Sequence, residues 1–215
     1  MIYDTIGFID IKTFMVTWRE LALENNLPGF YFIGMTPSTL SIYVDSNGEQ
    51  KTCLPNLRSS ATLFQNMLDI GFDAINSFGK RRGEMLAVGK FKSLINKLLM
   101  KLHLMDSINY DYATTVEGFF APEDKWENVF PTIMPNWDRT ARVGKADGVY
   151  LNSTPEAFKE HLHQACELVK DKAEEHQVII IKSWNEWAEG NYLEPDSLYG
   201  KQYLDVIKQE LSTDY

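Results

Sequence analysis

The chain has 215 residues, of which 44% are hydrophobic and 24% charged, the composition of an ordinary globular protein with a single domain over residues 1–215. Its net charge of -9 disfavours a nucleic-acid-binding protein, because contacts with phosphates usually need a basic face. Sugars, other neutral ligands or cations suit an acidic protein better. The N-terminal segment lacks a basic stretch before an apolar run, and no apolar run reaches the roughly 18 residues of a membrane helix. A cytoplasmic protein without a secretory signal or membrane helix is therefore predicted.

The cysteines and histidines give no indication of a metal site. Cys53 and Cys166 lie far apart, without CxxC spacing, and are predicted to be reduced structural thiols. The histidines show no arrangement with carboxylates that would hold a metal, and no glycine-rich nucleotide-binding motif is present. No metal and no cofactor are therefore predicted. The histidines are His103, His161, His163 and His176.

The first third of the chain alternates helices with apolar strands. Apolar residues at three-and-four spacing predict a helix over residues 11–25, which "NNLPGF" ends. "GFYFIGM" (29–35) predicts a buried strand. Alternating residues around Asn47-Gly48 predict a small β-hairpin insertion. A helix near residues 60–70 follows.

The middle third begins with the strand "FDAINSF" (72–78). The basic run "KRRG" (80–83) is predicted to be a solvated loop, although such a run could also meet the phosphate of a lipid or nucleotide sugar. The next helix has an apolar stripe that is predicted to be packing surface, and a short helix is expected around residues 110–118. "NVFPTIM" (128–134) then predicts a strand that enters a polar loop. The stripe comprises Phe91, Leu94, Ile95, Leu98, Leu99 and Leu102.

The last third contains a well-marked helix start, "NSTPEAF". Ser153 or Thr154 can cap this helix, and Pro155 suits its first turn, so a helix to about residue 175 is predicted. The strand "QVIIIKSW" (177–184), an acidic loop and a final helix follow. Continuous apolar strands alternating with helices predict an α/β fold with a parallel sheet, in which ligands bind at the carboxyl ends of the strands.

The acidic loop contains a pair of glutamates at a spacing suited to acid/base chemistry. Glu186 and Glu189 are three residues apart, so a single turn would bring them to one side of the chain. Neighbouring carboxyls repel each other when both are charged, which favours one acid and one base, and such a pair about 5 Å apart cleaves glycosidic bonds with retention. Trp184 and Trp187 can stack on sugar rings, and Asn185 can bond hydroxyls. The alternative is a solvated acidic loop or a helix start.

The segment "SWNEWAEGNYLEPDSLYGKQYL" (183–204) resembles the C-terminal motif of the WbsX-like glycosyltransferase family, bacterial proteins encoded with O-antigen and capsule biosynthesis. That family is similar to glycoside hydrolase family 99, the endo-α-mannosidase group. The resemblance continues, in order, through "WRELALENNLPGFYFIGM", "GFDA", "MPNWDRTAR" and "STPEAF". It implies a (β/α)8 TIM barrel that acts on an oligosaccharide or polysaccharide in lipopolysaccharide and other surface-polysaccharide biosynthesis.

The resemblance also implies roles for the two glutamates. Glu186 resembles the base that acts on the sugar's own 2-hydroxyl, and Glu189 resembles the general acid/base at the leaving oxygen. Ala188 stands where the hydrolases usually have His, which leaves the substrate open. The family is described as transferases, whereas the residues resemble those of hydrolases, and two glutamates do not distinguish the two reactions.

Further candidate residues lie in "NWDRTAR" and after the glutamate pair. The first group is predicted to form the opposite wall of the site, where an arginine can fix a hydroxyl, carboxylate or phosphate; the alternative is an Asp–Arg ion pair that pins a loop. The second group is predicted to line the pocket, with capping of the last helix as the alternative for Glu194. These predicted substrate-binding residues are Trp137, Asp138, Arg139, Arg142, Tyr192 and Glu194.

The number of strands is half of what a closed barrel needs. Four strands are predicted, at 29–35, 72–78, 128–134 and 177–184, whereas a (β/α)8 barrel has eight. The resemblance thus implies the C-terminal half of such a barrel, and three explanations are open: a fragment that lacks the N-terminal half, a homodimer of half-barrels that covers the sheet edges, or a non-catalytic remnant or glycan-binding subunit.

Overall fold

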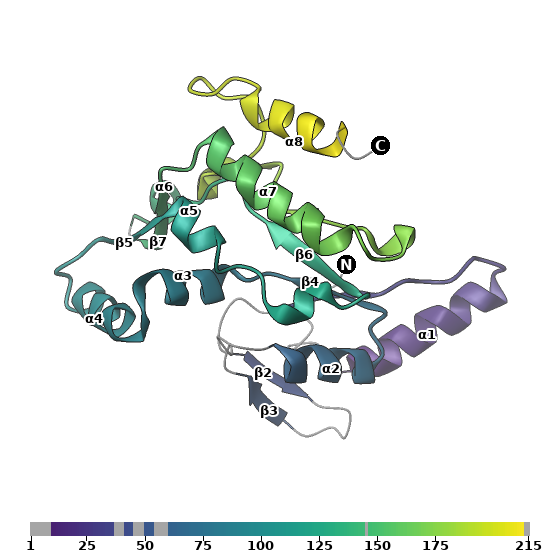
Figure 1. Ribbon diagram of the computed structural model, residues 1–215. Helices are drawn as coiled ribbons and strands as arrows, with labels where there is room; N and C mark the ends of the chain where they lie inside the picture. The colour runs from purple at the N-terminus through teal and green to yellow at the C-terminus, as the bar shows by residue number, and fades with distance from the viewer. Residues whose placement is uncertain (1–9, 37–40, 45–49, 54–59, 145, 213–215) are drawn as a thin grey trace.

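A computed structural model of the chain describes residues 10–36, 41–44, 50–53, 60–144 and 146–212 (Figure 1). Its centre is a parallel sheet in the order β1-β4-β6-β8. Each strand lies within one of the four predicted segments, so the predicted parallel α/β arrangement is confirmed. Since every pair is parallel, all four strands end at one edge, called here the carboxyl edge. The strands are β1 (Ile33–Met35), β4 (Ala74–Ser77), β6 (Val129–Ile133) and β8 (Ile180–Ile181).

The helices cover one face of this curled sheet, because Ile75, Val129 and Ile133 share a face and pack against α2 and α7. In Figure 1 the helices follow its curve, with α7 and α8 above β6 and α1 and α2 below β4. The α-helices are α1 (Ile11–Glu24), α2 (Ala61–Ile70), α3 (Lys80–Val88), α4 (Lys90–Lys101), α5 (Tyr112–Val116), α6 (Thr140–Val143), α7 (Pro155–Val169) and α8 (Gln202–Ser212). Two short 3₁₀ helices are η1 (Pro122–Lys125) and η2 (Glu174–His176). No helix in the described ranges is long and apolar enough to cross a membrane.

The central strands are buried on both faces, which explains their continuous apolar sequences. Ile75 and Val129 join the cluster that contains Phe64 and Met67 of α2. Ile133 packs instead with Phe158 and other residues of α7. Successive strand residues point to opposite faces, so this packing directs Asn76 and Thr132 to the other side. There the Asn76 Nδ2 donates a hydrogen bond of 2.5 Å to the Thr132 hydroxyl.

A second pair of parallel strands was not predicted. β5 (Ser107–Asp111) and β7 (Ala146–Leu151) pair in parallel as a separate two-stranded sheet. The helix expected at 110–118 is therefore wrong in its first turn: residues 110 and 111 belong to β5, and α5 begins at Tyr112. Asp111 marks the change, because its carboxylate accepts a hydrogen bond from the backbone N–H of Thr114 and caps the helix.

Other predicted boundaries hold or shift by a few residues. Thr154 caps α7 through a hydrogen bond from the Ala157 N–H, as expected, but the helix ends at Val169 and not near residue 175. The β-hairpin is confirmed by the antiparallel pair β2 (Ser41–Val44) and β3 (Gln50–Cys53), whereas the Asn47-Gly48 turn and the Cys53 side chain lie outside the described residues. Cys166 is not part of a disulfide bond.

Two predictions about the basic region are wrong. The run 80–83 is the start of α3, not a solvated loop. Lys80 is mostly buried, and its ammonium contacts Glu84 at 2.5 Å. The apolar stripe of α4 is also not packing surface. Five of its six residues are exposed, while the polar Ser93 and Asn96 of the same helix are buried. The exposed residues are Phe91, Leu94, Ile95, Leu98 and Leu102.

Candidate functional site

The acidic loop, residues 182–196, leaves the carboxyl edge directly after β8 and folds back as a tight hairpin. β9 (Asn185–Glu186) pairs antiparallel with β10 (Asn191–Tyr192), and the 3₁₀ turn η3 (Trp187–Glu189) connects them. Gly190 closes the turn at a φ of 52°, and a Cβ there would lie 2.7 Å from the Asp138 carbonyl oxygen. Only glycine therefore fits, because a side chain would be strained and would collide with the neighbouring backbone.

A second loop, residues 135–144 after β6, is joined to this hairpin by hydrogen bonds. The Asn136 side-chain oxygen accepts from the Tyr192 N–H at 3.0 Å, and its carbonyl accepts from the Asn191 side chain at 2.5 Å. The Asp138 N–H donates to the Glu189 carbonyl at 2.9 Å. Sequence analysis did not single out Asn136 or Asn191, although both lie in the recognised motifs. Their amides satisfy backbone groups of two loops that meet only in the fold.

The two glutamates of the candidate acid/base pair surround one cation. Arg142 Nη1 lies 3.3 Å from Glu189 Oε1 and 3.8 Å from Glu186 Oε1. Glu189 is the more enclosed of the two, with 17% of its side chain exposed against 42% for Glu186, and its other oxygen lies 3.8 Å from Lys182 Nζ. Sequence analysis did not single out Lys182, the residue at which the strand enters the loop. The three-residue spacing and one turn thus place both carboxylates on the same side of the hairpin, facing Arg142.

Arg142 reaches the glutamates from α6, whose start is held by Asp138. The Asp138 carboxylate accepts hydrogen bonds from the Thr140 N–H at 2.9 Å and from its hydroxyl at 2.6 Å. Arg142, one of the two arginines near Asp138 in the sequence, contacts the glutamates. Arg139 lies half-buried just before the helix, and its predicted contact with a ligand stays a prediction.

Two tryptophans stand beside the carboxylates, each about half exposed: Trp184 and Trp187. Trp187 stacks on Tyr192, with ring centroids 3.8 Å apart and planes at 13°, and its Nε1 donates to Glu194 at 2.6 Å. Glu194 thus orients this indole. Burial and the neighbouring Asp196 raise the pKa of Tyr192, so its hydroxyl stays protonated and donates to Asp196. Trp184 has no such clamp among the described residues, and its exposed ring is available for stacking.

Trp137 lies beneath this surface. It is buried between two lysines, with Lys80 Nζ 4.8 Å and Lys182 Nζ 5.2 Å from its ring centroid. Both distances fit cation–π contacts. Trp137 therefore positions Lys182 beneath Glu189, and it does not offer a free face to a ligand in this arrangement.

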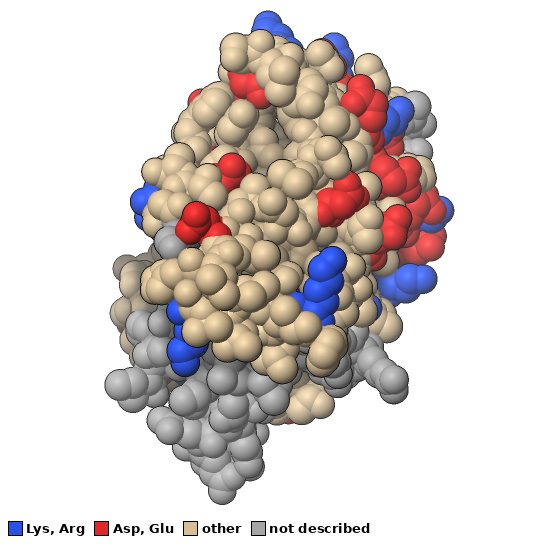
Figure 2. Space-filling view, turned by 90° about the vertical axis from the view of Figure 1, so that its left-hand side faces the viewer, with Lys and Arg blue, Asp and Glu red and all other residues tan. Residues whose placement is uncertain are grey.

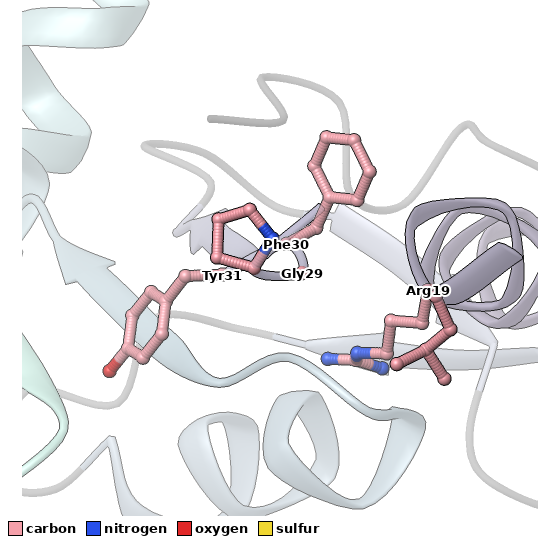
Figure 3. Close-up of a pocket in the computed structure, with 6 residues that line it drawn as sticks. Arg19, Gly29, Phe30 and Tyr31 are labelled. Carbon is pink, nitrogen blue, oxygen red and sulfur yellow. The ribbon is translucent and has the colours of Figure 1, made fainter. Parts of the chain in front are cut away.

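The depression in Figure 3 lies elsewhere. It is lined by residues 28–31, which precede β1, and by Arg19 and Leu23 of α1, so it is at the amino ends of the strands. Arg19 is held by Asp73 at 2.8 Å, and the same carboxylate accepts from the Phe32 N–H at 2.7 Å. These contacts join α1 to the starts of β1 and β4, so Arg19 and Asp73 stabilise the fold. The candidate site is the open surface of the acidic loop.

The fold and the site together define an α/β protein with a carboxylate pair and aromatic residues at the carboxyl edge of a curled parallel sheet. A solved structure described as a glycoside hydrolase-like protein superposes on 93% of this chain with a TM-score of 0.54 and 17% identity, and the match covers 49% of that protein. The fold is thus shared with about half of that protein.

The model of the family Glycosyltransferase WbsX matches residues 1–207, and the chain belongs to this family. The WxcX protein of Xanthomonas campestris pv. campestris strain B100 is 32% identical over 145 residues, which is 67% of this chain but 20% of the relative. WxcX of strain ATCC 33913 is 32% identical over 85 residues, 39% of this chain and 12% of the relative. The chain thus spans a fifth or less of the length of these relatives.

Proposed function

We propose that the chain is the C-terminal half of a (β/α)8 domain that cleaves or transfers an α-linked glycan, with Glu186 and Glu189 as its acid/base pair. The observation that carries this proposal is the convergence of both carboxylates on Arg142 at the carboxyl edge, beside two exposed indole rings. Family membership and the shared fold with half of a glycoside hydrolase-like protein support it. By the same resemblance we assign the glycan to bacterial surface polysaccharide.

In the proposed reaction the sugar's own 2-oxygen displaces the leaving group. Glu189 donates a proton to the glycosidic oxygen while Glu186 removes the proton of the 2-hydroxyl, and the 2-oxygen bonds to the anomeric carbon as the glycosidic bond breaks. In the second step an acceptor hydroxyl attacks the anomeric carbon and gives its proton to Glu189, while the bond between that carbon and the 2-oxygen breaks and Glu186 returns a proton to the 2-oxygen. Two inversions give net retention. The acceptor is water in hydrolysis and a sugar hydroxyl in transfer.

The other side chains bind and position. Arg142 and Lys182 offset the repulsion of the two carboxylates, which otherwise face each other without a counter-charge. Trp184 and the Trp187–Tyr192 stack provide flat apolar surfaces for sugar rings. Asn185, exposed at the start of the hairpin, bonds a sugar hydroxyl.

The test is turnover of a panel of α-linked oligosaccharides and bacterial polysaccharides by this chain, with and without nucleotide sugars. We expect product without a nucleotide sugar, and NMR should show that the anomeric configuration of the first product is retained. Activity that depends strictly on a nucleotide-sugar donor, or an inverted product, would contradict the mechanism.

A glycan-binding role without catalysis is the second candidate, because the chain superposes on only about half of the solved glycoside hydrolase-like protein. In that case Glu186→Gln and Glu189→Gln would leave glycan affinity unchanged and no product would form with any variant. Titration of the tryptophan fluorescence, to which the exposed Trp184 and Trp187 contribute, with the same panel measures the affinity directly.

A further inference from the structure

Helix α4 presents its apolar side chains to solvent and its polar ones to the protein. Phe91 is 78%, Leu94 66% and Leu98 54% exposed, whereas Ser93 and Asn96 are 6% and 9% exposed. A helix that only covers a protein core has the opposite orientation. The exposed apolar stripe of α4 therefore needs a partner that the described part of the chain does not supply.

The two faces follow from the helical period. At about 100° per residue, Ser93, Asn96 and Met100 share one side of α4, and Met100 packs against the core cluster around Tyr110. The apolar stripe lies on the opposite side and continues past the helix end. In Figure 1, α4 lies at the left margin, away from the four-stranded sheet, with α3 as its neighbour. The stripe comprises Phe91, Leu94, Ile95, Leu98 and Leu102, followed by Leu104.

The charge around this stripe is opposite to that of the chain. Residues 90–101, the helix itself, contain four of the 21 lysines and arginines and no acidic residue, in a protein of net charge -9. Lys92 and Lys101 are exposed and, by the helical period, flank the stripe on its two sides. Figure 2 faces this side of the molecule and shows basic side chains at the margins of an uncharged surface in its lower half, with acidic side chains above.

We propose that α4 binds in the interfacial layer of an anionic lipid bilayer, with its apolar stripe among the upper acyl chains and its lysines at the lipid phosphates. Apolar residues on one face and lysines beside them are the features of helices that lie in this layer. The helix has 12 residues, too few to span the bilayer, so it lies along the surface.

Charge argues against a second copy of the chain as the partner. In a symmetric dimer the same patch meets itself, which would bring Lys92 and Lys101 of one copy close to those of the other. An anionic surface attracts the lysines instead, and each basic residue near such a surface strengthens binding. The proposal does not depend on the reaction assigned to the glutamates.

The experiment is sedimentation of the folded chain with vesicles of phosphatidylcholine alone or mixed with an equal part of phosphatidylglycerol. We expect at least about tenfold stronger binding to the anionic vesicles, weakened by added salt. Leu94→Ser/Leu98→Ser and Lys92→Glu/Lys101→Glu should each reduce binding by about tenfold or more. Lys201→Glu/Lys208→Glu on or beside α8 makes the same change in net charge at exposed positions and should change binding less than about twofold.

Circular dichroism confirms that each variant is folded, and the lysine pair carries the test if the leucine pair fails to fold. Absence of binding by the wild-type chain would overturn the proposal. Equal binding of the Lys92→Glu/Lys101→Glu and Lys201→Glu/Lys208→Glu variants would overturn it as well. Light scattering that shows a dimer, lost in Leu94→Ser/Leu98→Ser without any effect of lipid, would assign the stripe to a second copy.

Discussion

The Arg142 guanidinium lies 3.3 Å from the Glu189 carboxylate and also contacts Glu186, so one exposed arginine serves both acids. We expect Arg142→Met to lower kcat at least about tenfold, which corresponds to about 1.4 kcal/mol of transition-state stabilisation. Stability should change by less than about 1 kcal/mol, because exposed ion pairs contribute little to it. Steady-state kinetics and urea unfolding measure the two effects. Lys159→Met, which removes the exposed pair with Glu210, is the matched control; equal turnover of both variants would contradict the assignment.

Gly190 is the position at which the acidic loop depends most on its backbone. Gly190→Ala combines a φ of 52° with a contact of 2.7 Å to the Asp138 carbonyl, and we expect it to cost at least about 2 kcal/mol. Gly200→Ala has a similar φ of 56° but open space at the Cβ, so it should cost only about 1 kcal/mol. Urea unfolding compares the two variants. An equal loss would mean that the close approach of the two loops has no effect on stability.

His161 makes folding sensitive to acid. It is fully buried against Tyr112 and Phe119, and desolvation lowers its pKa to about 3. Unfolded histidine has a pKa of about 6.5, so the unfolded state binds more protons in the window between these values, and stability falls as the pH drops from 6.5 to 3. From pH 7.5 to 5 this group should remove about 2 kcal/mol.

Urea unfolding at the two pH values measures this loss. His161→Gln should reduce the pH dependence, whereas His163→Gln, at a half-exposed position on the same helix, should leave most of it. If the His161→Gln variant loses as much stability between pH 7.5 and pH 5 as the wild-type protein, His161 is not the group responsible.

The Trp187–Tyr192 stack should act on substrate binding more than on the chemical step. Tyr192→Ala removes the ring that supports Trp187, and we expect KM to rise about fivefold or more with a smaller change in kcat. Tyr31→Ala removes an exposed ring at the opposite end of the strands and should leave KM unchanged. A fall in kcat alone would point instead to a role for the stack in placing the glutamates.

The core strands could be predicted because they are continuous apolar runs, as in "QVIIIKSW", and such runs are typical of a sheet buried on both faces. β5 and β7 could not be predicted in this way. "SINYD" has only five residues and alternates buried with exposed positions, and "ADGVYL" contains an Asp-Gly pair that favours a turn. Their pairing brings residues 40 apart into register, which local sequence does not reveal.

The candidate site shows the same division. The three-residue spacing predicted that Glu186 and Glu189 would share one side of a turn, because that relation is local. The contacts of Arg142 and Asn136 with the acidic loop join segments about 45 to 55 residues apart, and only the fold brings these together. The orientation of α4 was also beyond sequence analysis, since an amphipathic stripe does not tell which face the protein covers.

The most direct test of the assigned pair is the initial rate of Glu186→Gln and Glu189→Gln on the α-linked glycan that the wild-type protein turns over, with Glu160→Gln on α7 as control. We expect a loss of at least about a thousandfold for each site variant and none for the control. Glu189→Gln alone should regain part of its rate on a substrate whose leaving group needs no proton. A wild-type rate in either site variant would contradict the assignment.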